Sequence, residues 1–224
     1  MKIFCIIVLV FFGAAISMNL KENLDFLDHH QNIEMVVDTA MNGTQYIAEE
    51  LYSFEHNKLR AKLTSWDAKE PAFDMLFDYT EGYMLFYYNL TGDCRVLDLP
   101  KMDMKAYYRD IMVNHTEYAG KRGHLELFEV KEPRKDSRTW VYGLFTHHEE
   151  SNRPYFMPVR MQTHDPMLHV DFTNEMIDTI TFPEVTAADF DYSMCKKTTY
   201  GGEVEHHSMF NVAQTVLKAE LITM

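Results

Sequence analysis

The chain has 224 residues and a formal net charge of −13 at pH 7, because 34 acidic side chains outnumber 21 basic ones. A protein this acidic repels nucleic acid and anionic membranes, so neither is an expected partner. A chain of this length can bury a full core as one domain, and all-β domains commonly reach this size.

The first residues have the pattern of a secretory signal peptide. Lys2 precedes an apolar stretch, Ile3 to Phe12, and Ala15 and Ser17 are small residues where signal peptidase requires them. The apolar stretch is shorter than the roughly 20 residues of a membrane-spanning helix, although an uncleaved anchor is an alternative. We therefore expect a signal peptide at residues 1–17 and a single secreted domain at residues 18–224, with no later membrane span.

The cysteines agree with export. Cys5 lies inside the signal peptide, so Cys94 and Cys195 are the pair that remains. In an oxidising compartment such a pair usually forms a disulfide. Two separate buried thiols are the alternative. In a secreted protein, N-glycosylation sequons are acceptors for glycans, and this sequence has sequons that begin at Asn42, Asn89 and Asn114.

The first half of the chain changes from a mixed to an alternating pattern. Helical stretches are expected around Asn23–His29 and Ile33–Ala40 within a polar segment. From Phe54 onward apolar residues recur with period two, which predicts a strand at Leu59–Leu63. Phe73–Leu90 alternates on both sides of an acidic turn that contains glycine, as in a β-hairpin.

The second half continues with short strands. They are expected at Val96–Leu99, Leu125–Val130, Arg138–Thr146, Tyr155–Gln162 and Leu168–Phe172. Residues 101–121 are less regular, residues 174–191 suit short helical turns, and residues 203–224 have the spacing of an amphipathic helix. Many strands and few helices predict an α+β, mainly β fold, with a mainly antiparallel sheet and helices packed on one face.

The sequon at Asn89 assigns faces to the hairpin, because a glycosylated side chain must point to solvent and strand side chains alternate. The residues then expected to face the core or a cavity are Met84, Phe86, Tyr88 and Leu90. The residues that share the Asn89 face are apolar, so they cover a second layer or form an oligomer contact: Tyr83, Leu85 and Tyr87.

A search for catalytic motifs is negative. The sequence has no Gly-x-Ser-x-Gly elbow, no His-Glu-x-x-His, no phosphate-binding glycine loop and no dinucleotide fingerprint. An enzyme is therefore not expected. The acidity is compatible with calcium, but no EF-hand spacing is present and no calcium ligands are assigned.

The apolar composition is more informative. The chain has 16 Met, 15 Phe and 13 Tyr, and they concentrate in the expected strands. Such side chains on the concave side of a curved sheet can line an adaptable lipophilic pocket. The alternative, which composition alone favours, is an ordinary packed core.

The stretch from Asn57 to Cys195 resembles the ependymin family. The resemblance depends on an ordered set of short motifs: Asn57 to Arg60, the aromatic hairpin Phe77 to Phe86, Asp93-Cys94, Trp140 to Gly143, and Phe182-Pro183 followed by Cys195. Family members usually carry further cysteines near both ends, and this chain lacks them.

The resemblance implies a secreted, glycosylated, non-enzymatic protein with a lipoprotein-carrier-like fold, a curved antiparallel sheet backed by helices around a hydrophobic pocket. It also implies homodimers, association with calcium, and a hydrophobic ligand such as a fatty acid or phospholipid. Strand parity selects the pocket candidates Met75, Phe77, Met84, Phe86, Tyr88 and Leu144. The alternative function is a structural or adhesive calcium-binding glycoprotein without a ligand pocket.

Overall fold

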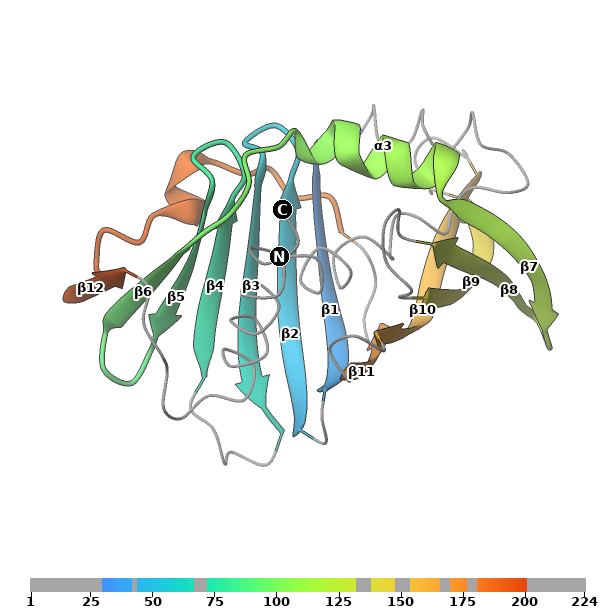
Figure 1. Ribbon diagram of the computed structural model, residues 1–224, viewed down its shortest axis with the longest axis horizontal. Coiled ribbons are helices and arrows are strands. Elements are labelled where there is room, and N and C mark those ends of the chain that lie inside the picture. The colour runs from blue at the N-terminus through green and yellow to red at the C-terminus, as the bar shows by residue number, and fades with distance from the viewer. Residues whose placement is uncertain are drawn as a thin grey trace.

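The computed structural model describes residues 30–41, 44–66, 72–131, 138–147, 154–165, 170–176 and 181–200. The described strands form one curved, 12-stranded sheet in the order β12-β6-β5-β4-β3-β2-β1-β11-β10-β9-β8-β7 (Figure 1). The mainly β, mainly antiparallel fold expected from the sequence is confirmed. The predicted signal peptide, the helical stretches at Asn23–His29 and 203–224, and Asn42 lie outside the described residues.

The first half of the sheet is a meander in which each strand pairs with the next in antiparallel orientation. Its strands are β1 (Asn32–Met41), β2 (Thr44–Ser53), β3 (Lys58–Ser65), β4 (Phe73–Asp78), β5 (Tyr83–Tyr88) and β6 (Asp93–Asp98). The predicted hairpin at Phe73–Leu90 corresponds to β4 and β5.

The second half is another antiparallel meander, which follows helix α3 (Met104–Asn114). Its strands are β7 (Thr116–Arg122), β8 (Leu125–Lys131), β9 (Arg138–His147), β10 (Pro154–Asp165) and β11 (Val170–Met176). β11 pairs with β1, so the two meanders join into one sheet. The chain then forms the 3-10 helix η1 (Ala187–Phe190) and the strand β12 (Lys197–Tyr200), which pairs in parallel with β6.

The helical prediction for Ile33–Ala40 is wrong, because this segment is strand β1. Ile33, Met35 and Val37 are buried and alternate with less buried residues, which is the period of a strand. Pairing with β2 on one side and β11 on the other satisfies the backbone of β1, and this tertiary contact decides between the two patterns.

Helix α3 lies within residues 101–121, where the sequence pattern is less regular. The carboxylate of Asp103 accepts a hydrogen bond of 2.9 Å from the amide of Ala106, a standard N-cap that begins the helix. Met104, Tyr108 and Ile111 follow at helical spacing and are buried against the sheet. The helix crosses one end of the curved sheet, from the first meander towards β7 (Figure 1). None of the helices in the described part of the chain is long and apolar enough to cross a membrane.

The sheet buries apolar side chains on both faces. On the concave face, the main core cluster combines residues of both meanders and α3. On the opposite, convex face of the first meander, Leu51, Leu76 and Leu85 pack with Phe190 of η1. Tyr83 and Tyr87 border this second cluster, so the apolar Asn89 face predicted from the sequence covers a second layer of the same chain.

The disulfide Cys94–Cys195 fastens this second layer to β6, with 5.7 Å between the two Cα atoms. The predicted pairing is thus present. Beside it, the amide of Lys196 donates a hydrogen bond of 2.8 Å to the carbonyl of Gly92. The Arg60 guanidinium donates a hydrogen bond of 2.8 Å to the carbonyl of Asp189, also on the convex side. These contacts hold the 185–195 segment against the sheet and lead the chain into β12.

Candidate functional site: the concave face of the sheet

Most of the predicted pocket residues lie together on the concave face. In the β4–β5 register, Met75 is opposite Phe86 and Phe77 is opposite Met84. All of these side chains are buried in the main core cluster, and half-buried Tyr88 packs against it. Five of the six predicted residues therefore form one continuous surface on β4 and β5.

The sixth residue, Leu144, is not part of this surface. In the same strand, β9, Val141 belongs to the concave cluster and Phe145 packs against it. Side chains alternate between the two faces along a strand, and Leu144 is one residue from Phe145 and three from Val141. Leu144 therefore lies on the other face of the sheet. Leu90, which was also expected inside, is 80% exposed because β5 ends at Tyr88 and the chain turns before it.

An aromatic cluster extends the concave face into the second meander. Phe156 of β10 packs edge-on against Phe128 of β8, with 5.0 Å between ring centroids, and against Phe145 of β9 at 5.5 Å. Gly143 makes this possible, since a Cβ atom there would lie 2.4 Å from the Phe156 ring. The apolar and aromatic lining of the concave face thus includes residues of β4 and β5 and of β8, β9 and β10, which are far apart in sequence.

One acidic residue interrupts this apolar face. Glu50 lies on the concave side of β2, is only 3% exposed, and accepts a hydrogen bond from the Tyr52 hydroxyl. Burial raises the pKa of the Glu50 carboxyl from 4.5 to about 7, and the Tyr52 hydrogen bond opposes the shift. Sequence reasoning missed Glu50, although its parity with Tyr46, Ala48 and Tyr52 places it on the buried side of β2.

Tyr52, the hydrogen-bond donor to Glu50, interacts with two more tyrosines near α3. Burial raises the pKa of Tyr52 well above its usual value, and the charge of Glu50 and the neighbouring Tyr108 and Tyr79 raise it further. Tyr108 of α3 also packs edge-on against Phe54, with 5.6 Å between ring centroids. Glu50 and these tyrosines form a polar cluster inside the apolar core, where the helix covers the sheet.

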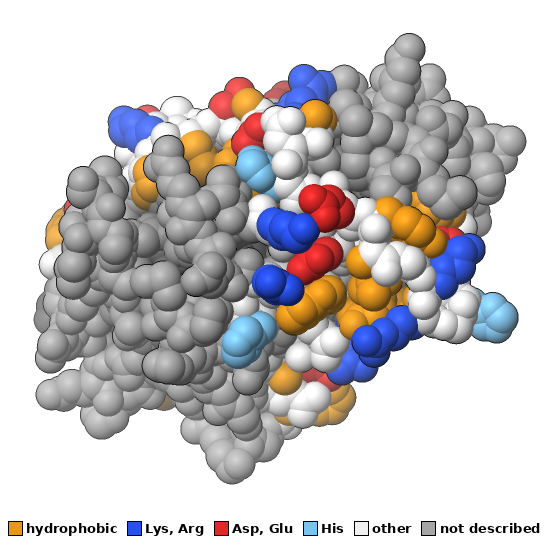
Figure 2. All heavy atoms as spheres, turned by 45° about the vertical axis from the view of Figure 1, so that its right-hand side comes forward, with side chains coloured by type: hydrophobic (Ala, Val, Ile, Leu, Met, Phe, Trp, Pro, Cys, Tyr) orange, Lys and Arg blue, Asp and Glu red, His pale blue; other side chains and the backbone are white. Residues whose placement is uncertain are grey.

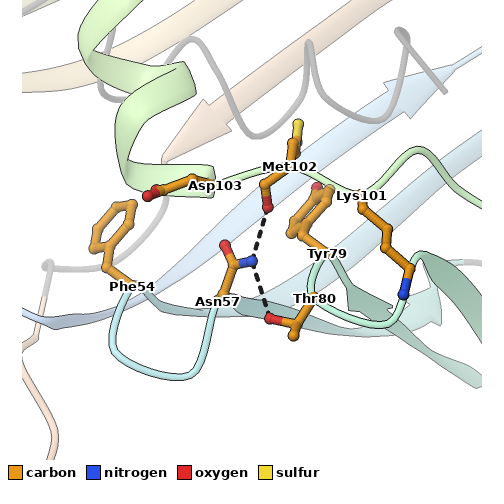
Figure 3. Close-up of a pocket in the computed structure, with 7 residues that line it drawn as sticks. All are labelled: Phe54, Asn57, Tyr79, Thr80, Lys101, Met102 and Asp103. Atoms are coloured by element: carbon orange, nitrogen blue, oxygen red, sulfur yellow. Dashed lines mark hydrogen bonds between the residues drawn. The ribbon is translucent and has the colours of Figure 1, made fainter.

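A pocket of about 440 Å³ lies next to this cluster, at the start of α3 (Figure 3). It is lined by Phe54, Asn57, Tyr79, Thr80, Lys101, Met102 and Asp103. Tyr79 belongs both to this lining and to the group around Tyr52. The pocket is therefore an opening on the described surface that is adjacent to the buried tyrosines.

Asn57 organises the pocket by connecting three segments. Its side-chain amide donates to the carbonyl of Met102 at 2.8 Å and to the hydroxyl of Thr80 at 3.1 Å (Figure 3). Its side-chain oxygen accepts from the amide of Met104, the first residue of α3, at 2.8 Å. The backbone of Asn57 has a φ of 55°, a conformation that asparagine and glycine tolerate better than other residues.

The variant Asn57→Gly keeps this backbone conformation and removes all three side-chain hydrogen bonds. We expect a loss of about 1–3 kcal/mol in the free energy of unfolding, with faster hydrogen exchange in the first turn of α3. Thr80→Ala is the control, because it removes only one of the bonds and should cost less. Equal stability of Asn57→Gly and the wild type in urea denaturation would contradict this role.

The remaining predicted sites lie on the surface. Asn89 and Asn114 are exposed, as an attached glycan requires, and their side chains hydrogen-bond to Asp74 and Asp110. Among the described residues, no group of three or more His, Cys, Asp or Glu side chains is arranged to hold a metal ion. Calcium association and glycosylation stay predictions from the sequence.

Charges of both signs lie close together near the β7 edge of the sheet. Lys121 pairs with Glu126 and Lys131 with Glu117, each at 2.6 Å. Figure 2, which brings this end of the molecule forward, shows basic and acidic side chains next to one another. A surface that binds a polyanion carries mainly positive charge, whereas this surface carries both signs. Charged side chains on an edge strand also hinder its pairing with strands of other chains.

No model of a known protein family matches the sequence, and no curated protein matches it either. Among solved structures, the fold is similar to an uncharacterized conserved protein from Thermus thermophilus, with a TM-score of 0.51 and 12% identity. The match covers 80% of this chain and 96% of that one. At this identity the similarity concerns the fold alone.

Two further solved structures resemble this chain with TM-scores below 0.5. One is a putative outer membrane lipoprotein-sorting protein domain from Vibrio parahaemolyticus, with a TM-score of 0.40, 10% identity, and coverage of 74% of this chain and 91% of that one. The other is a DUF1329 family protein from Desulfovibrio piger, with a TM-score of 0.38, 10% identity, and coverage of 77% and 95%.

Proposed function

We propose that this chain is a secreted glycoprotein of the ependymin family that binds a hydrophobic ligand, such as a fatty acid or phospholipid, on the concave face of its sheet. The observation that carries the proposal is the lining of that face. Met75, Phe77, Met84 and Phe86 form one continuous apolar surface, and the aromatic cluster of the second meander extends it. Flexible methionines and aromatic rings suit an adaptable lipophilic site.

Other features support export. The Cys94–Cys195 disulfide suits an oxidising compartment, where such bonds form and persist. The sequons at Asn89 and Asn114 are exposed to glycosyltransferases. Homodimerisation and calcium association belong to the same proposal through the family resemblance, as does the lack of enzymatic activity.

The test uses protein made in a eukaryotic secretory host. Native mass spectrometry should detect a co-purified lipid, and the delipidated protein should take up an uncharged, solvent-sensitive fluorescent probe. Met84→Ala should reduce the capacity for this probe, because Met84 lies on the concave face. Leu85→Ala is the matched control: it removes a similar volume from the convex face and should leave the capacity unchanged.

Two results would contradict the proposal. One is protein that carries no lipid and takes up no probe; the other is equal loss of probe in the two alanine variants. Calcium-dependent self-association together with a core that admits no probe would favour the structural or adhesive alternative instead.

A further inference from the structure

Glu50 is a buried acid, and the described residues next to it are mostly apolar. In the sheet register it lies between Met35 of β1 and Ala61 of β3, and neither side chain carries a polar group. The hydroxyl of Tyr52 is the hydrogen-bond donor to its carboxylate. Burying a carboxylate costs free energy unless hydrogen bonds or an opposite charge compensate, and the Tyr52 hydroxyl, its donor within the described part of the chain, compensates only in part.

Tyr52 on β2 is the described ionisable group that affects the pKa of the Glu50 carboxyl. The pKa of Tyr52 is in turn raised by Glu50 and by two more tyrosines, Tyr108 on α3 and Tyr79 just after β4, while the neighbouring strands β1 and β3 contribute apolar side chains. Phenols are neutral at physiological pH. Within the described part of the chain, no Lys, Arg or His side chain shifts the pKa of the Glu50 carboxyl.

A ligand with a cationic end matches this environment. A protonated amine has three N–H donors and the charge opposite to that of a carboxylate. Its hydrocarbon chain would lie along the methionines and phenylalanines of the same face. The carboxylate of a fatty acid has the same charge as ionised Glu50, and like charges in one buried site repel.

We propose that Glu50 anchors the polar end of the ligand, and that the preferred ligand is an amphiphile that carries a protonated amine. This inference rests on the proposed function and, among the hydrophobic ligands considered there, favours an amphiphile with an amine over a fatty acid. The ammonium group pairs with the Glu50 carboxylate beneath α3, and the alkyl chain extends over the apolar part of the concave face.

The experiment compares dodecylamine, dodecanol and dodecanoate, each below its micelle concentration, as competitors for the uncharged probe on delipidated protein. At a pH above 7, where Glu50 is mainly ionised, dodecylamine should bind at least about tenfold more tightly than the other two, because it alone carries the charge opposite to that of the Glu50 carboxylate. Glu50→Gln should abolish this preference. Glu49→Gln removes the same charge from the adjacent, exposed position on the other face and should preserve it.

A second variant separates folding from recognition. Tyr52→Phe keeps the carboxylate and removes its hydroxyl donor, so the preference for dodecylamine should persist in a folded protein. Equal affinities for the three competitors, or a preference that survives Glu50→Gln, would overturn the anchoring role while probe binding upholds the proposed function. Absence of probe binding by the wild type would overturn both.

Discussion

Replacing both Cys94 and Cys195 by alanine should lower the free energy of unfolding by up to about 4.7 kcal/mol, the chain-entropy value for a loop of about 100 residues. The two cysteines are 101 positions apart, so the bond removes much of the freedom of the unfolded chain. The free energy of unfolding of an ordinary domain is roughly 5–15 kcal/mol, so this loss is a large part of it. Urea denaturation of the variant and the wild type measures it.

The loss should have a local counterpart on the convex face. Without the bond, the 185–195 segment keeps non-covalent contacts such as the packing of Phe190 on Leu51 and Leu76 and the hydrogen bond from Arg60 to Asp189. Its amide hydrogen exchange should accelerate more than that of β3 or β4. The reduced wild type is the control and should behave like the double variant. An unchanged denaturation midpoint would show that packing and hydrogen bonds hold the second layer without the disulfide.

The contribution of Glu50 to the stability of the ligand-free protein should fall as pH rises from about 4.5 to above 7. The pKa of this carboxyl is 4.5 without burial and about 7 in the folded protein. Between these values the folded state retains a proton that the unfolded chain has lost. The contribution is therefore fully present below pH 4.5 and is lost as pH rises through about 7, a change of roughly 3 kcal/mol.

Glu50→Gln isolates this effect, because other titrating groups cancel in the difference between the two proteins. The stability difference, measured by urea denaturation at several pH values, should be constant below pH 4.5. Above that pH the wild type should lose stability relative to the variant. A difference that does not change with pH would mean that Glu50 is solvated in the folded protein.

The sequence was sufficient to predict the parts of the fold where one face of a strand is clearly marked. The hairpin of β4 and β5 was predicted because apolar residues alternate there and a sequon at Asn89 labels the outer face. The same label explains why Met84 and Phe86 were assigned correctly to the concave face. In β9 no sequon marks the solvent-facing side, so strand alternation alone could not show that Leu144 lies on the face opposite the concave cluster.

The errors have physical causes in tertiary structure. β1 was predicted as helical because short apolar patterns fit both periods, and only pairing with β2 and β11 decides between them. The N-cap at Asp103 was an overlooked local signal for the start of α3. The burial of Glu50 follows only once Thr44–Ser53 is recognised as strand β2. The helical prediction for Ile33–Ala40, just before it, does not suggest a strand there.

The join between the two meanders also determines the order in which the chain can fold. Each meander pairs strands that are neighbours in sequence, so both can form soon after synthesis. The pairing of β1 with β11 brings Val37 next to Met176, and such a distant contact must wait until the second meander is complete. Until then β1 has an open edge that can pair with another chain. The risk that β1 pairs with another chain should therefore end when β11 pairs with it. Synthesis that is slow or truncated after β10 should lead to aggregation.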